Sequence, residues 1–143
     1  MVGVVSVESI IAQLAIIEAG ITGIKVAYDK APEALGELPA VLNFPREGEI
    51  ERHAAGGIRL VKHSLGVQVF VVRGVLEQAE AELRPFLKRF MDTMDINISI
   101  NGTCFTSQLK NYRYGRLEYG GEQYLGIDFT LVAEEKEQVS FSG

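Results

Sequence analysis

The residues of this sequence that could carry chemistry are few and lie far apart. The imidazoles of His53 and His63 could bind a metal ion or act as a general base, and the thiol of Cys104 could act as a nucleophile. Neither histidine lies in a cluster with metal-ligand spacing. A catalytic Cys–His pair requires the fold to bring Cys104 to His63, whereas a small thiol packed in a strand requires nothing further. The sequence therefore predicts no metal site, no cofactor and no enzymatic activity.

A stretch rich in glycine and tyrosine, YGGEQYLGIDFTL (119–131), raises the question of a ligand site. A phosphate-binding loop places its glycines between a strand and a helix, but here alternating apolar residues follow, which is the period of a half-buried strand. Base stacking combines aromatic residues with a basic groove, and this chain has a net charge of −5. We therefore interpret residues 114–123 as the connection between two antiparallel strands.

Length and composition are those of one globular domain. The chain has 143 residues, of which 47% are hydrophobic and 23% are charged, and it contains one cysteine. No basic leader begins the sequence, and the longest apolar stretch is too short to span a bilayer, so we expect an intracellular protein. The acidic balance disfavours electrostatic binding to nucleic acid. We assign residues 1–133 to a single α+β domain and residues 134–143 to a mobile C-terminal tail.

Two segments have helical periodicity. The first follows Ser6 as the predicted N-cap and ends at Gly20. Its apolar stripe consists of Val7, Ile10, Leu14 and Ile17, with Ile11 and Ile16 widening it. The second follows Gly74 as the predicted N-cap, and Pro85 is expected to kink or split it. Its apolar positions are Leu76, Ala79, Leu83, Phe86 or Leu87, Phe90 and Met94.

Apolar runs and alternation predict the strands. The expected strands are 23–29, 38–45, 58–73, about 103–112, and 124–133. Pro39 and Pro45 cannot donate to a ladder and are expected at strand ends or on an edge. Together these elements predict an α+β fold in which about two helices pack on one face of a mainly antiparallel or mixed sheet.

The order of these elements resembles that of the tail terminator (tail completion) proteins of long-tailed phages. The resemblance covers residues 7–133 and rests on LPAVLNFP, LGVQVFVVR, LRPFLKRFMD, INGT and YGGEQYLGIDFTLVA, in that order. It implies a structural subunit that forms a ring, usually hexameric, on the head-proximal end of the tail tube. Such a ring ends tube polymerisation and provides the attachment surface for the head or neck.

The resemblance also implies partners and a location. The partners are further copies of the chain, the tail tube protein and the head or neck connector, and DNA passes through the channel without specific recognition. The expected location is the virion tail, after assembly in the host cytoplasm, with no role for a membrane. Two alternatives remain: a head–tail joining protein of related fold, and a cytosolic α+β domain that binds a small ligand, which a large apolar pocket would favour.

A charged segment, REGEIERHAAGG (46–57), is predicted to be a long loop between two strands. Exposed ion pairs contribute little, so a monomer gains little by ordering it, whereas a neighbour in a ring could cover Ile50 and pair the charges. We expect the segment to be mobile in the monomer and ordered in the assembly; the alternative is a solvated hairpin tip without a partner. The candidate assembly interface consists of Arg46, Glu47, Glu49, Ile50, Glu51 and Arg52.

Overall fold

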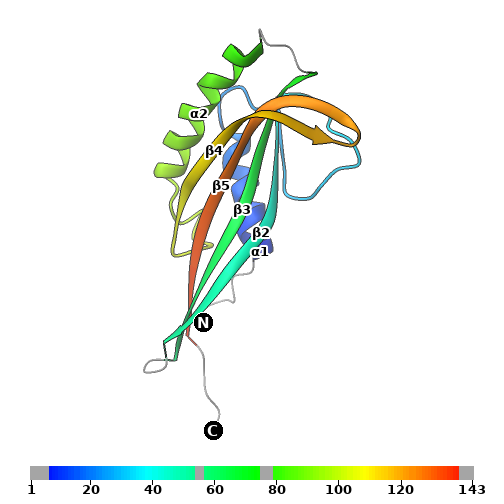
Figure 1. Ribbon diagram of the computed structural model, residues 1–143. Coiled ribbons are helices and arrows are strands. Elements are labelled where there is room, and N and C mark those ends of the chain that lie inside the picture. Colours follow the sequence, from blue (N-terminus) through cyan, green and yellow to red (C-terminus); the bar gives the residue numbers. More distant parts are fainter. Residues whose placement is uncertain (1–6, 54–56, 75–78, 139–143) are drawn as a thin grey trace.

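The computed structural model of the chain describes residues 7–53, 57–74 and 79–138. Its elements are α1 (Val7–Ala19), β1 (Val26–Tyr28), β2 (Ala40–His53), β3 (Ile58–Arg73), α2 (Glu80–Asp95), β4 (Thr106–Tyr119) and β5 (Glu122–Gln138). The strands form one sheet in the order β1-β2-β3-β5-β4, in which only the β1–β2 pair is parallel. Both helices pack on the same face of this sheet (Figure 1). The predicted α+β fold class is confirmed.

Helix α1 buries the stripe that its sequence predicts, with one exception. Of the predicted stripe it buries Ile10, Ile11 and Leu14 and partly buries Val7 and Ile17, and Ala15 is buried with them. Ile16, which was predicted to widen this stripe, is 61% exposed, because a residue two positions from Leu14 lies on the opposite side of a helix. Glu18, four residues after Leu14, is instead fully buried. The predicted N-cap, Ser6, lies outside the described residues.

Helix α2 begins later than predicted, and its proline does not break it. Its first residue is Glu80, with Ala79 at the N-cap position. Gly74, the predicted N-cap, lies before this helix, and its backbone N–H donates to the Gln123 carbonyl at 2.8 Å, at the end of the β3–β5 pair. Pro85 lies inside one continuous helix, where it removes a single backbone hydrogen bond. The predicted apolar positions that are buried are Ala79, Leu83, Phe86, Phe90 and Met94, whereas Leu76 lies outside the described residues.

The main core lies between the two helices and the sheet. The sheet contributes the alternating residues that the sequence predicts, namely Leu65, Val67, Val69 and Val71 on β3 and Leu125, Ile127, Phe129 and Leu131 on β5. The Phe129 ring stacks on the Phe90 ring of α2, with 5.2 Å between the ring centroids. The predicted register of both strands is therefore confirmed.

The opposite face of the sheet, which we call the outer face, is covered at one end only. There the connection between β1 and β2 lies over a second, smaller cluster that consists of Leu35, Leu42, Phe70, Leu117 and Tyr124. The Tyr119 hydroxyl donates to the Pro32 carbonyl of that connection. Away from this end, the described residues leave the outer face open, and its side chains are mainly polar.

A two-residue turn joins β4 to β5. Gly120 and Gly121 both have positive φ, of 59° and 82°, as a tight antiparallel hairpin requires. The predicted hairpin is confirmed, but its connection is these two glycines instead of residues 114–123. β4 likewise runs to Tyr119, beyond the predicted end of its strand near residue 112.

The sheet continues into an arm made of residues 47–53 of β2, 58–64 of β3 and 132–138 of β5. These segments pair in register from Glu47, Ser64 and Val132 to the tip of the arm. Figure 1 shows the arm extending past the ends of both helices. Its β2 part was predicted to be a loop, and that prediction is wrong for the residues before 54. Residues 134–138, assigned to the tail from sequence, are the last part of β5; residues 139–143 lie outside the described part.

Candidate functional site

The six residues predicted to form an assembly interface lie on one strand of the arm or at its base. Each is part of β2, and Arg46 marks a register shift between β2 and β3, which begins after Pro45. The strand forms because β3 supplies the hydrogen-bond partners, with Glu47 opposite Ser64 and Arg52 opposite Arg59. The structure therefore orders this segment within the monomer, and no neighbouring subunit is needed for that.

Arg46 binds residues of its own chain. Its guanidinium donates to the Asp128 carboxylate and, at 3.3 Å, to the Thr130 hydroxyl, both on β5. It also lies over the Phe44 ring, 5.3 Å from the centroid. Gly66 makes room for this arrangement, since a Cβ at that position would lie 2.4 Å from Phe44 Cζ and 2.6 Å from Arg46 Nε. Arg46 therefore has a structural role on the outer face.

The remaining described side chains of the predicted interface are exposed. Glu47, Glu49 and Glu51 alternate along β2, which places all three on the outer face, and none forms an ion pair within the described part of the chain. Ile50 lies on the other face of the arm and is 68% exposed. The arm thus presents, on one side, three carboxylates without an ion partner among the described residues and, on the other, a large apolar side chain.

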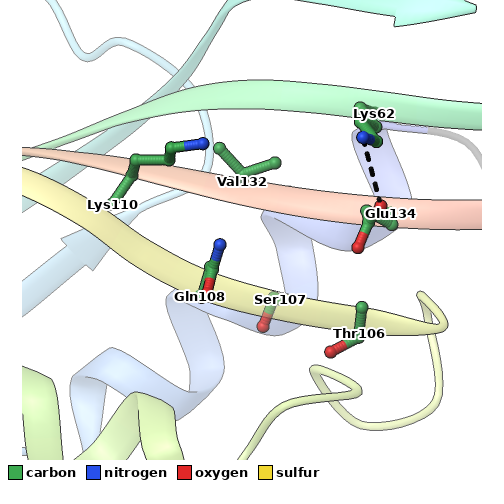
Figure 2. Close-up of a pocket in the computed structure, with 7 residues that line it drawn as sticks. All are labelled: Lys62, Thr106, Ser107, Gln108, Lys110, Val132 and Glu134. Carbon is green, nitrogen blue, oxygen red and sulfur yellow. Dashed lines mark ion pairs between the residues drawn. The ribbon is translucent and has the colours of Figure 1, made fainter.

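A shallow polar depression lies on the outer face beside the arm (Figure 2). It has a volume of about 250 Å³ and is lined by Lys62, Thr106, Ser107, Gln108, Lys110, Val132 and Glu134. The Lys62 ammonium lies 3.8 Å from the Glu134 carboxylate, so one of the two lysines is already paired. The lining is not the apolar surface that encloses most small organic ligands.

Glu18 and Asn43 form a buried polar contact between α1 and β2. The Asn43 amide donates to Glu18 Oε1 at 2.6 Å and to the Tyr28 carbonyl at 3.0 Å. Burial raises the pKa of Glu18 to about 8, and the hydrogen bond from Asn43 opposes that shift in part. The sequence reasoning missed this pair, although Glu18 lies four residues after Leu14 and hence on the buried stripe.

His63 binds a carboxylate rather than the thiol of Cys104. Its Nε2 lies 2.7 Å from Oε2 of Glu135, which is buried, and the two residues come from adjacent strands. Cys104 Sγ instead donates to the Ile98 carbonyl at 3.6 Å and packs against the main core. Burial, and to a smaller degree the Glu135 carboxylate, raise the pKa of the Cys104 thiol to about 11. At neutral pH the thiol is therefore protonated and a weak nucleophile.

Among residues 7–53, 57–74 and 79–138, no group of three or more His, Cys, Asp and Glu side chains is placed to hold a metal ion. Neither helix in this part of the chain is long and apolar enough to cross a membrane.

The arm, the outer face and the two buried polar pairs are thus the features from which a function must be argued. Comparison of the sequence with known protein families and with curated proteins found no match.

Proposed function

We propose that the protein is a structural subunit of a phage tail that assembles into a ring, hexameric by the resemblance described above. The ring caps the head-proximal end of the tail tube, ends its polymerisation and provides the attachment surface for the head or neck. Its partners are further copies of the chain, the tail tube protein and the head or neck connector. The finished ring is part of the virion tail.

The observation that carries this proposal is the arm. A three-stranded extension exposes Ile50 and carries three carboxylates that have no ion pair within the described residues. An extension of this kind exposes more surface than a compact sheet of the same strands, and burial of Ile50 by a partner would contribute about 1.5–3 kcal/mol. A neighbouring subunit that covers the arm recovers this free energy, as subunits of an assembly do.

The charge of the chain is compatible with a channel that DNA traverses. With a net charge of −5, the subunit has no overall attraction for phosphates, so DNA could pass without being held. A head–tail joining protein would share these properties, and only its position between head and tail separates the two roles. The small-ligand alternative is supported less well, because the depression on the outer face is polar and shallow.

Electron microscopy of the purified protein, alone and mixed with tail tubes, tests the proposal. We expect closed rings with a channel about as wide as duplex DNA, bound at one end of each tube, and tubes that stop growing when the ring is added. Light scattering after size exclusion gives the number of subunits. Rings that bind only isolated heads would favour the head–tail joining role. A protein that stays monomeric at high concentration and in the presence of tubes would contradict both.

A further inference from the structure

Two edges of the sheet lack a strand partner within the described chain. β1 pairs only with Ala40–Leu42, so the rest of β2, including its arm segment, has no described strand on the side away from β3. β4 is the last strand at the other end of the sheet and has no outer neighbour along Thr106–Tyr119. Such edges present backbone N–H and C=O groups that can pair with a strand of another chain.

The two edges carry opposite charges. We call Glu47, Glu49 and Glu51 on β2 the acidic edge, and Lys110 and Arg113 on β4 the basic edge; all five residues are exposed. Arg113 has one weak partner, since its guanidinium lies 3.7 Å from the Asp128 carboxylate while its side chain is 78% exposed. The other four form no ion pair with a described residue.

The charges that would meet lie on the same face of the sheet. Glu49 lies opposite Lys62 in the register of β2 and β3, which places both on the same face, and Lys62 and Lys110 line the same depression on the outer face (Figure 2). Arg113 contacts Asp128, which also binds Arg46 on that face. If β2 of one subunit continued the sheet beyond β4 of another, the carboxylates and the cations would therefore lie on one surface.

The same charges disfavour the contacts between like edges. Two acidic edges, or two basic edges, would place like charges opposite one another, which destabilises a strand pair. Each edge also carries an interruption of its backbone hydrogen-bonding groups: Pro45 and the register shift at Arg46 on β2, and the register shift at Lys110 on β4. The stretch of β2 that can pair without interruption therefore begins only after Arg46. The charges instead favour pairing of an acidic edge with a basic edge. Because this contact joins two different surfaces, it is head-to-tail, and repeated contacts of this kind close into a ring when the rotation between neighbouring subunits allows it.

We propose that the acidic edge of β2 in one subunit pairs with the basic edge of β4 in the next, so that the sheets continue from subunit to subunit around the oligomer. This inference rests on the homo-oligomeric ring of the proposed function and names the two surfaces that build it. The occupant of each edge is a second copy of this chain.

Charge reversal with rescue tests the pairing. One variant carries Glu47→Lys, Glu49→Lys and Glu51→Lys, a second carries Lys110→Glu and Arg113→Glu, and a third combines all five changes. Each reversed edge should raise the concentration for half-maximal assembly at least tenfold, and the combined variant should recover most of that loss. The matched control, Glu33→Lys with Glu37→Lys, changes exposed carboxylates of the β1–β2 connection and should assemble like the wild type.

A carbodiimide cross-linker, which joins a carboxylate to an amine in contact, locates the edges in the wild-type protein. In a mixture of ¹⁴N- and ¹⁵N-labelled subunits, we expect mixed-isotope links between Lys110 and the acidic edge. The Lys62–Glu134 pair within one chain is the internal positive control.

The outcomes separate the two proposals. Rings that are unaffected by either reversal, or that show no mixed-isotope link to Lys110, overturn the edge pairing and leave the ring standing. A wild-type protein that never assembles overturns both. Circular dichroism of each variant confirms the fold, and if a reversed variant does not fold, the cross-linking result on the wild type decides.

Discussion

Asn43 Nδ2 lies 2.6 Å from Glu18 Oε1, while the other two oxygens of the pair, Glu18 Oε2 and Asn43 Oδ1, are buried without a hydrogen-bond partner among the described residues. Both are acceptors if Glu18 is ionised, and a proton on Glu18 adds the donor that they lack. The raised pKa of Glu18, about 8, has the same physical cause, because burial penalises the charged carboxylate. The folded protein therefore holds a proton that the unfolded chain releases near the ordinary pKa of 4.5.

This proton makes stability depend on pH. The folded-state pKa is raised, so the contribution of Glu18 is fully present below about pH 4.5 and is lost as pH rises to about 8. The free energy of unfolding should fall across this window by at most about 1.4 kcal/mol per pH unit. Glu18→Gln, whose amide cannot ionise, should remove this dependence and be the more stable protein at pH 8. Urea denaturation from pH 4 to pH 9 measures the effect.

Glu8→Gln is the matched control, since Glu8 is exposed on the same helix. It should keep the pH dependence of the wild type. Parallel curves for the wild type and Glu18→Gln would show that Glu18 is ionised in the folded protein.

Phe129→Ala should destabilise the protein by about 3–5 kcal/mol, as removal of a buried aromatic side chain does. Phe129 is 1% exposed and stacks on Phe90, so its loss leaves a cavity between β5 and α2. Phe105, which is 58% exposed, provides the comparison, and Phe105→Ala should cost under about 1 kcal/mol. Chemical denaturation of both variants gives the values, and similar costs would contradict the placement of the two rings.

Gly126→Ala should be strongly destabilising, although it adds only one methyl group. A Cβ at Gly126 would lie 2.0 Å from the Val69 carbonyl oxygen and 2.7 Å from Leu117 Cδ1, so β3 and β5 would have to separate. We expect a loss of about 2–3 kcal/mol or more, in the range of overpacked cores. At Gly36 a Cβ would meet only the Tyr28 hydroxyl, at 3.5 Å, and Gly36→Ala should leave the melting temperature almost unchanged.

Arg46→Glu should destabilise the monomer. The substitution places a carboxylate beside Asp128, whose side chain is 12% exposed, and leaves Asp128 without its main cation. A loss of about 1–3 kcal/mol is expected, whereas Glu49→Lys on the exposed edge should change stability by less than about 0.5 kcal/mol. Thermal unfolding at a concentration where the protein is monomeric distinguishes the two.

Cys104 should react slowly with alkylating reagents at neutral pH. Burial, with a smaller contribution from Glu135, raises the pKa of its thiol to about 11, so the thiolate is scarce below that pH. Glu135→Gln should speed the reaction by lowering this pKa, without restoring the rate of a free thiol. Iodoacetamide labelling followed by mass spectrometry, with glutathione as the reference, gives the rates. A rate equal to that of glutathione at pH 7 would show that the thiol is open and unshifted.

The parts of the fold that were predictable are those in which one face is buried. Leu65 to Val71 and Leu125 to Leu131 alternate because the helices cover one side of the sheet, and this leaves a period in the sequence. The β2 segment of the arm leaves none, since Glu49 and Ile50 are both exposed there. This strand is held by hydrogen bonds to β3, and pairing between strands cannot be predicted from the composition of one segment.

Of the candidate interface, the sequence predicted the exposure of the side chains but not the contacts that they make. Exposure of Glu47, Glu49 and Ile50 follows from local polarity, and the sequence indicated it. The role of Arg46 depends on Asp128, 82 residues away, so no local pattern could reveal it. Glu18 is different, because its helical spacing from Leu14 placed it on a buried face, and that signal was available.

Strand β5 runs without interruption from the two-glycine turn to the tip of the arm, where Gln138 pairs with Ile58. At about 3.4 Å per residue it spans roughly 55 Å, so its two ends are far apart on the molecule. A label attached at Gln138 lies at the arm end of β5, at the tip of the arm whose β2 strand is proposed to join subunits. A tag inserted between Gly120 and Gly121 lies at the other end. Labels at the two ends would report separately on contacts at the arm and at the hairpin.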